Sequence, residues 1–125
     1  MSKQKTIAVD LDDVICHRSG EYEHLGVNKY DFCVANVDMV CVVNSLYDDG
    51  HHIVIYTARG MSQFEGDVET VRNQLFDKTT RQLEEWQVRY HELVMGKIHY
   101  DLLIDDKALN SIGITKQTIE EFLHE

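Results

Sequence analysis

Apolar, β-branched runs alternate with helical patterns along this chain. Residues 6–9 form an uncharged run of Thr, Ile, Ala and Val, which predicts a strand buried on both faces of a parallel sheet. Similar runs at residues 52–56 and 100–104 predict two further strands. The run at residues 92–95 fits either a short strand or the tail of a helix, because periodicity does not separate the two.

Between the runs, apolar positions recur with helical spacing. This spacing predicts helices over residues 34–47 and 68–86, and two adjacent threonines leave open a break in the second. A last helix is expected after Thr115, a good capping residue. Residues 16–33 are polar and rich in turn formers, so we expect an irregular excursion over the sheet edge. The alternation predicts a three-layer α/β/α fold with a doubly wound parallel sheet.

Length and composition limit the functional classes. The 125 residues suit a single domain, residues 1–125, in which 16–33 is a short loop or flap insertion. The net charge of −10 argues against general binding to nucleic acids or anionic membranes, so we expect neither partner. Three cysteines without metal-type spacing favour a reduced, cytoplasmic setting. We expect no signal peptide or transmembrane segment, because the first predicted strand starts at residue 6 and no apolar run is long enough.

Acidic residues follow two of the predicted strands. Asp10 and Asp12 come at the end of the first strand, and Asp105 and Asp106 follow the last. The carboxyl ends of strands in an open α/β sheet form its usual ligand-binding edge. Carboxylates that meet there repel one another unless a cation or a proton intervenes. A divalent-cation site is therefore the leading hypothesis.

The residue types at these strand ends suit phosphate esters. The Asp10 carboxylate can attack phosphorus and form an aspartyl-phosphate, while Asp12 can protonate the leaving oxygen and then deprotonate the attacking water. Mg²⁺ would bridge the carboxylates and the phosphate. Thr57 can donate a hydrogen bond to the phosphoryl group, and Lys97 can supply a positive charge. Arg59 either grips the substrate or forms a surface salt bridge.

Four ordered elements resemble the haloacid dehalogenase (HAD) superfamily of phosphohydrolases. The family pattern is an apolar strand followed by D-x-D-x-[TV], a strand ending in Ser or Thr, a later Lys, and a strand ending in an acidic pair. The corresponding elements here are residues 7–14, residues 53–57, Lys97 and residues 102–106, in the same order. They span most of the chain, which makes the resemblance far more specific than a lone D-x-D.

The resemblance implies a role for each matching residue. It makes Asp10 the nucleophile, Asp12 the general acid and base, and Thr57 and Lys97 the groups that hold the phosphoryl oxygens, with Lys107 as a rival for Lys97. The implied cofactor is Mg²⁺, and its implied ligands are Asp10, Asp12 through its carbonyl, Asp105 and Asp106.

Within the superfamily, residues 57–59, 96–97 and 104–108 look like those of small bacterial phosphatases of capsule polysaccharide biosynthesis. This similarity implies that the substrate is a sugar phosphate or another small phosphorylated metabolite. Residues 16–33 are too few for a full cap domain, so the chain is expected to be capless. Capless members act on large substrates or borrow a lid from a neighbouring subunit, and a homo-oligomer is therefore expected.

Two other functions stay open at this point. A nucleoside monophosphate phosphatase would use the same chemistry, although no aromatic base-stacking site is evident in the sequence. A non-catalytic, receiver-like Mg²⁺-binding module would also place acids, a Thr and a Lys at strand ends. Receivers, however, carry the phosphorylated Asp on a middle strand, where residues 55–57 offer none. This difference favours the hydrolase.

Overall fold

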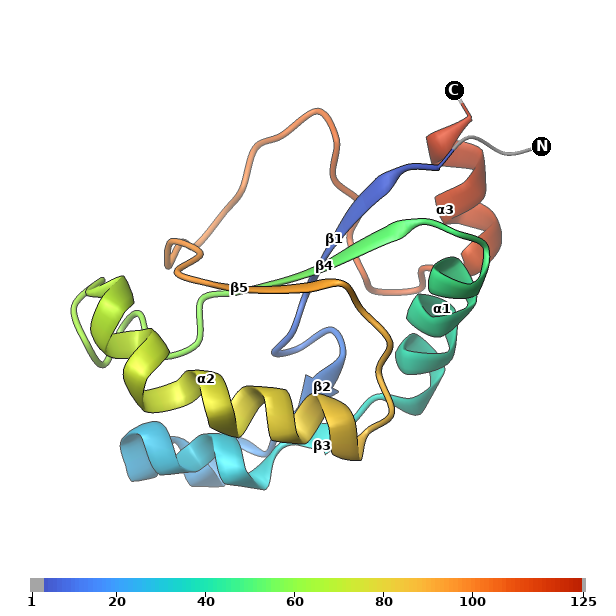
Figure 1. Cartoon of the computed structure of the whole chain (residues 1–125). Coiled ribbons are helices and arrows are strands. Elements are labelled where there is room, and N and C mark those ends of the chain that lie inside the picture. The colour runs from blue at the N-terminus through green and yellow to red at the C-terminus, as the bar shows by residue number, and fades with distance from the viewer. Residues whose placement is uncertain (1–3, 125) are drawn as a thin grey trace.

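A three-stranded parallel sheet forms the centre of the protein, whose computed structural model describes residues 4–124 (Figure 1). The strands are β1 (Thr6–Asp10), β4 (His52–Thr57) and β5 (Glu92–Met95), and β4 lies between the other two. Residues 92–95 are thus a strand. The register pairs Asp10 with Tyr56 and Thr57 with Met95, so the carboxyl ends of all three strands meet at one edge of the sheet.

Two helices connect these strands, α1 (Val37–Asp48) and α2 (Val68–Glu85). The side chains of Asn36 and Asp67 cap them by accepting hydrogen bonds from backbone amides in the first turn. Helix α2 runs without a break through its two adjacent threonines. The hydroxyl of the buried Thr79 donates to the carbonyl of Leu75, which satisfies this polar group within the helix.

Both connecting helices lie on the same side of the sheet in Figure 1. The strands accordingly alternate: Ile53 and Ile55 of β4 are fully buried, whereas Val54 and Ala8 are not. The prediction of a first strand buried on both faces is therefore wrong, because the short run Ile-Ala-Val also satisfies a strand with one covered face. The described residues form a small α/β fold, and its parallel sheet is confirmed. The three-layer, doubly wound arrangement is not seen.

The segment predicted as an irregular excursion is ordered. Strands β2 (Cys16–His17) and β3 (Val34–Ala35) pair antiparallel and enclose η1 (Gly20–Phe32), a 3₁₀ segment with a kink at Gly26. The buried Tyr30 fastens η1 to the rest of the molecule. Its hydroxyl accepts a hydrogen bond from the amide of Gly60, and its carbonyl accepts one from the Gln82 side chain of α2.

The predicted strand at residues 100–104 does not form, and residues 96–115 contain no helix or strand. Leu102 and Ile104 are 75% and 89% exposed. A short apolar run becomes a strand only when a ladder partner accepts it, and residues 100–104 pair with no strand in the part of the chain that the structure describes. The last helix, α3 (Lys116–Leu123), forms as expected, with Thr115 in a capping box.

A groove of about 650 Å³ separates β1 and α1 from residues 98–123. Lys116 at the start of α3 forms an ion pair with Asp49 at the end of α1, with Nζ and Oδ2 2.7 Å apart, and Ile119 of α3 packs against the core. None of the helices within residues 4–124 combines the length and hydropathy needed to cross a bilayer.

Candidate functional site

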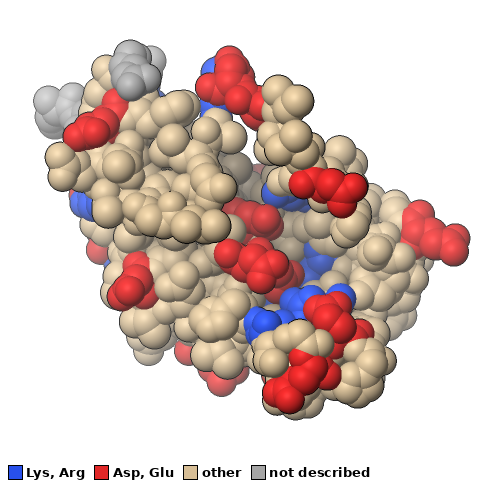
Figure 2. Space-filling model, turned by 180° about the vertical axis from the view of Figure 1, so that it is seen from behind, with Lys and Arg blue, Asp and Glu red and all other residues tan. Residues whose placement is uncertain are grey.

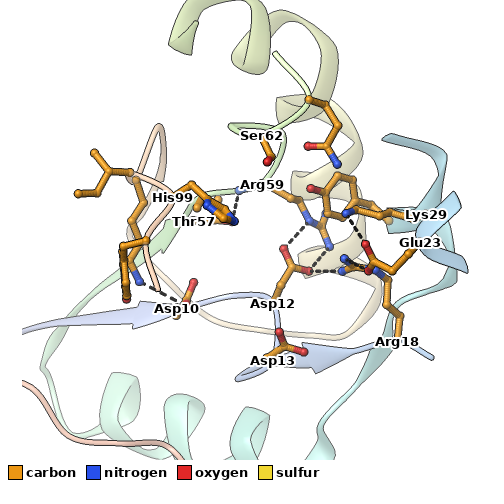
Figure 3. Close-up of a pocket in the computed structure, with 16 residues that line it drawn as sticks. Asp10, Asp12, Asp13, Arg18, Glu23, Lys29, Thr57, Arg59, Ser62 and His99 are labelled. Atoms are coloured by element: carbon orange, nitrogen blue, oxygen red, sulfur yellow. Dashed lines mark hydrogen bonds and ion pairs between the residues drawn. The ribbon is translucent and has the colours of Figure 1, made fainter. Parts of the chain in front are cut away.

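A cavity of about 430 Å³ opens at the carboxyl ends of β1 and β4. Acidic and basic side chains meet in a hollow on the face of the molecule that Figure 2 shows, and Figure 3 shows the cavity itself. Its walls come from the turn after β1, from η1, from the loop after β4 and from the segment after β5. The charged residues that line it are Asp10, Asp12, Asp13, Arg18, Glu23, Lys29, Arg59 and Lys97.

Asp10 and Lys97 face each other at one side of this cavity. Nζ of Lys97 lies 3.3 Å from Oδ2 of Asp10, whose Oδ1 accepts a hydrogen bond from the amide of Leu11. Burial raises the pKa of Asp10, and the charge of Lys97 only partly offsets this effect. Burial lowers the pKa of Lys97, but the Tyr100 side chain and Asp10 outweigh it, so its pKa is raised. The ammonium group is thus held charged beside the carboxylate.

Thr57 ends β4 next to this pair and is buried. Its carbonyl accepts a hydrogen bond from the amide of Lys97, which ties the exit of β5 to the end of β4. Its hydroxyl oxygen accepts one from the amide of Arg59. No acceptor for the hydroxyl hydrogen lies within hydrogen-bond distance in residues 4–124, so this hydrogen is available to a ligand in the cavity.

A tight turn after β1 directs Asp12 toward the cavity. The carbonyl of Leu11 accepts hydrogen bonds from the amides of Val14, Ile15 and Cys16. Asp13, at the tip of the turn, has a φ of 68°, a conformation that aspartate tolerates better than most residues. As a result, the chain reverses within a few residues of the strand end, and Asp12 lies across the cavity from Asp10 in Figure 3.

Asp12 forms an ion pair with Arg59, which is only 2% exposed. The guanidinium donates to both carboxylate oxygens and also to the side chains of Thr79 and Gln82 on α2. Of the two interpretations of Arg59, the surface salt bridge is therefore wrong, because the pair is buried. The Thr79 and Gln82 side chains of α2 accept from Arg59 and hold its guanidinium, which in turn fixes the direction in which the Asp12 carboxylate points.

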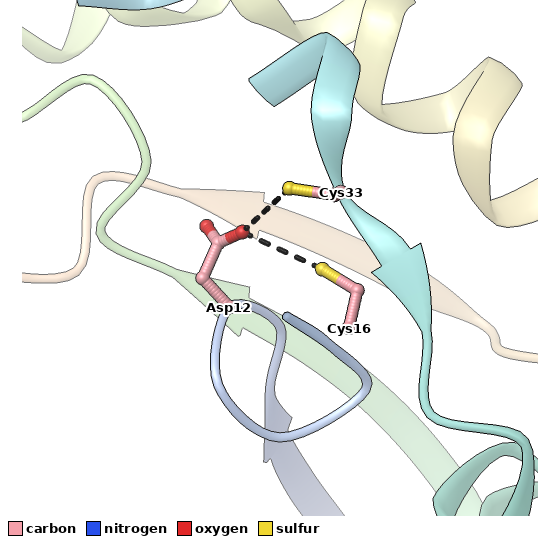
Figure 4. Close-up of side chains that lie close together, drawn as sticks. All are labelled: Asp12, Cys16 and Cys33. Carbon is pink, nitrogen blue, oxygen red and sulfur yellow. Dashed lines mark hydrogen bonds between the residues drawn. The ribbon is translucent and has the colours of Figure 1, made fainter. Parts of the chain in front are cut away.

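Cys16 and Cys33 contact the same carboxylate (Figure 4). Their thiols donate to Oδ1 of Asp12 at 3.5 and 3.7 Å. The three side chains form a candidate metal-binding triad, because their ligand atoms all lie within 4.8 Å of one another. A hydrogen bond from Cys16, together with the guanidinium of Arg59, lowers the pKa of Cys33 to about 7, while the same contact raises the pKa of Cys16.

This triad does not suit Mg²⁺. Thiolates are soft ligands that favour zinc or copper, whereas Mg²⁺ prefers an octahedron of oxygens. In addition, a positive charge is already present. Nη2 of Arg59 lies 3.2 Å from Asp12 Oδ1, 3.4 Å from the sulfur of Cys33 and 3.9 Å from that of Cys16. The three groups thus surround a guanidinium.

The acidic pair expected to complete a cation site lies elsewhere. Asp105 and Asp106 are exposed and do not line the cavity. Oδ1 of Asp105 accepts a hydrogen bond from the amide of Lys107, which with other local contacts lowers the pKa of Asp105. Asp105 and Lys107 line the groove that Asp10 also borders. The structure thus brings together five predicted site residues, Asp10, Asp12, Thr57, Arg59 and Lys97, but not the pair 105–106.

A second charged group in the cavity, formed by Arg18, Glu23 and Lys29, was not predicted from the sequence. Glu23 accepts hydrogen bonds from Arg18 at 2.8 Å and from Lys29 at 2.9 Å. All three lie in the polar segment that carries no motif, and only the packing of η1 over the strand ends brings them to the cavity. Charge alone does not distinguish such residues from a solvated surface.

Comparison with known proteins gives a fold but no family. No family model matches the chain, and no curated protein does either. A crystal structure of a structural-genomics target from Vibrio cholerae is similar, with a TM-score of 0.78 and 25% sequence identity. The match covers 97% of this chain and 98% of that protein. The similarity therefore extends over the whole α/β fold. It supports the fold and does not indicate an activity.

Proposed function

We propose that this protein is a HAD-type phosphohydrolase that cleaves a small phosphomonoester through an aspartyl-phosphate. The observation that carries the proposal is the pair of Asp10 and Lys97, 3.3 Å apart beside Thr57 in a cavity at the strand ends. A carboxylate, an ammonium and a free hydroxyl hydrogen together supply a nucleophile and two phosphate-binding groups.

Asp10 is the nucleophile in this mechanism. Its carboxylate oxygen attacks phosphorus, an aspartyl-phosphate bond forms, and the bond from phosphorus to the ester oxygen breaks. Lys97 and Thr57 bind the phosphoryl oxygens and stabilise the charge that develops on them. The ammonium of Lys97 also opposes the rise that burial causes in the pKa of Asp10, and so favours the ionised carboxylate that attacks.

Asp12 acts on the other side of the ester. It protonates the departing oxygen and later removes a proton from the water that hydrolyses the intermediate. Its contacts with Arg59 keep the carboxylate pointed into the cavity, and this fixed position lets one group serve both steps.

Mg²⁺ is the proposed cofactor, but the residues that line the cavity do not form its full ligand set. Asp10 and the backbone near Asp12 offer hard oxygens there, whereas Asp105 and Asp106 lie outside. If Asp106 is a ligand, Asp106→Asn raises the Mg²⁺ concentration for half-maximal activity about tenfold or more. An unchanged Mg²⁺ dependence would exclude Asp106 as a ligand.

The proposed substrate is a sugar phosphate or a similar metabolite, as in capsule polysaccharide biosynthesis, and a cavity of about 430 Å³ suits this size. His99 and Tyr100 also line the cavity and are exposed, which keeps a nucleoside monophosphate as the second candidate. A panel of sugar phosphates and nucleotides decides between the two classes.

The test of the activity is release of inorganic phosphate from p-nitrophenyl phosphate or a sugar phosphate in the presence of Mg²⁺. Asp10→Asn should abolish release, and Asp12→Asn should slow hydrolysis of the covalent intermediate. Asp38→Asn is the matched control, because Asp38 is an exposed acid in the first turn of α1. Wild-type turnover in Asp10→Asn would rule out Asp10 as the nucleophile.

A further inference from the structure

Three cations lie over a single aromatic ring in the wall of the cavity. The ring of Tyr30 has the side-chain charges of Arg18, Lys29 and Arg59 at 5.1, 5.4 and 4.6 Å from its centre. The carboxylates within ion-pair distance of them are those of Asp12 and Glu23. This wall therefore carries more positive than negative charge at pH values where the Cys33 thiol is protonated, in a chain whose net charge is −10.

Glu23 is the residue of this group whose contacts a ligand could take over. Its side chain is 55% exposed, whereas those of Arg18 and Lys29 are 14% and 12% exposed. Exposed ion pairs contribute little to stability, so the carboxylate of Glu23 can leave at small cost. The two cations stay in place, because their stems are buried and the ring of Tyr30 lies beneath them.

The hydrogen-bonding capacity of Arg18 is not saturated. Its Nε is buried and has no partner, while its terminal nitrogens contact Glu23 and Asp12. A planar guanidinium binds best to an acid group that takes two of its donors side by side. Glu23 accepts through one oxygen from Arg18 and gives the other to Lys29. An acidic ligand would find both cations already in position.

We propose that Arg18 and Lys29 form a second anion site, so that the substrate is a phosphomonoester with a further acidic group, which displaces Glu23. This inference rests on the proposed function, because the phosphoryl end is assigned to Asp10 and Lys97. The two ends line the same cavity, where Nη1 of Arg18 lies 3.7 Å from Asp12, which faces Asp10 across the cavity. A diacid long enough to span the cavity can therefore contact both ends. The second group is a carboxylate or a second phosphate.

Phosphonates test this site without turnover, since their carbon–phosphorus bond resists hydrolysis. Phosphonoacetate and ethylphosphonate differ only by a carboxylate in place of a methyl group, and phosphonopropionate and propylphosphonate form a longer pair. Methylenediphosphonate represents a second phosphate. In calorimetric titrations of the wild-type protein, we expect at least one acidic ligand to bind about tenfold more tightly than its alkyl partner. Equal affinities in both pairs and for the diphosphonate would overturn the proposal.

Variants separate displacement of Glu23 from a structural role. Glu23→Gln should increase the ratio of the affinity for the acidic phosphonate to that for its alkyl partner several-fold, because the competing carboxylate is gone. This ratio is the preference. If Glu23 only holds Arg18 and Lys29 in place, Glu23→Gln should instead reduce the ratio of the two affinities. A reduced ratio would therefore contradict displacement of Glu23 by the ligand. Lys29→Gln should reduce the preference to about twofold or less, whereas Lys29→Arg should retain it. Lys116→Gln, an ion-paired lysine outside the cavity, should leave the preference unchanged.

The two proposals fail in different ways. A preference for the acidic phosphonate together with wild-type turnover in Asp10→Asn would support the second anion site and reject Asp10 as nucleophile. Loss of turnover in Asp10→Asn together with equal phosphonate affinities would support the phosphohydrolase and reject the second site. No binding of any phosphonate would reject the second site outright.

Discussion

Arg59 and Asp12 form a two-point ion pair inside the protein, with Nε 3.1 Å from Oδ2 and Nη2 3.2 Å from Oδ1. The remaining donor of the guanidinium reaches α2, so the pair connects the turn after β1 with the helix that crosses beneath the sheet. Since Arg59 is buried, its charge depends on these partners. The position of the proposed acid and base is therefore coupled to the stability of the fold.

Replacing Arg59 should destabilise the protein strongly. Arg59→Met leaves the carboxylate of Asp12 without its main partner and removes the donors to Thr79 and Gln82. We expect a loss of about 3 kcal/mol in the free energy of unfolding, measured by urea denaturation. Arg89→Met is the control. Its ion pair with Asp48 is exposed, and we expect a loss below about 1 kcal/mol. Similar losses in both variants would contradict the buried role of Arg59.

The sequence predicted those site features that local pattern determines. Asp10 and Thr57 end apolar runs that form parallel strands. The carboxyl ends of neighbouring parallel strands lie at the same edge of the sheet, however the helices pack on it. The ion pair of Arg59 was not predictable, because it depends on how α2 packs beneath the loop after β4. The same holds for Arg18 and Lys29, whose segment has no apolar period. Their places are set by Tyr30 and its hydrogen bonds to distant residues.

The wrong predictions have a common physical origin. A run of four or five apolar residues indicates that the segment gains from burial, but it does not indicate which part of the protein will cover it. At residues 6–9 the run is covered on one face, and at residues 100–104 it is not paired at all. The acidic pair at residues 105–106 was predicted to follow a strand at residues 100–104 that does not form, and the pair lies outside the cavity.

Cys33 should react with alkylating agents near neutral pH. Its pKa is lowered to about 7, so the reactive thiolate is half formed there and its fraction rises with pH. We expect the rate of modification by iodoacetamide, followed peptide by peptide by mass spectrometry, to rise with a midpoint near that value. Cys16 should stay unmodified, because it is fully buried and its pKa is raised.

Arg59→Met provides the control for this pH dependence. Without the guanidinium 3.4 Å from its sulfur, Cys33 loses a charge that favours the thiolate. The midpoint for Cys33 should then move to higher pH, provided that circular dichroism shows the variant to be folded. A midpoint that stays the same would mean that Arg59 does not activate the thiol.

Gly60 should be harder to replace than Gly50, although both glycines have a positive φ. A Cβ at Gly60, where φ is +77°, would lie 2.5 Å from Cδ1 of the buried Leu75. Gly50 has a φ of +94° but open space around it. Backbone strain costs both alanine variants about 1 kcal/mol, and overpacking adds about 1–3 kcal/mol to Gly60→Ala alone. Equal losses in urea denaturation would show that Leu75 moves aside freely.

Removing the charge of Lys97 should shift the titration of Asp10. Burial raises the pKa of Asp10 and Lys97 lowers it, so Lys97→Met removes the opposing effect and should raise the pKa further. Asp10 would then become protonated at a higher pH, and the acid limb of the pH–rate profile should move in the same direction. The side-chain ¹³C shift of Asp10, followed by NMR against pH, measures this pKa independently of activity.

Lys116→Met is the control and should leave the titration of Asp10 unchanged, since Lys116 pairs with Asp49 and Glu120 outside the cavity. A titration of Asp10 that does not move in Lys97→Met would show that the 3.3 Å contact does not control the ionisation of the proposed nucleophile.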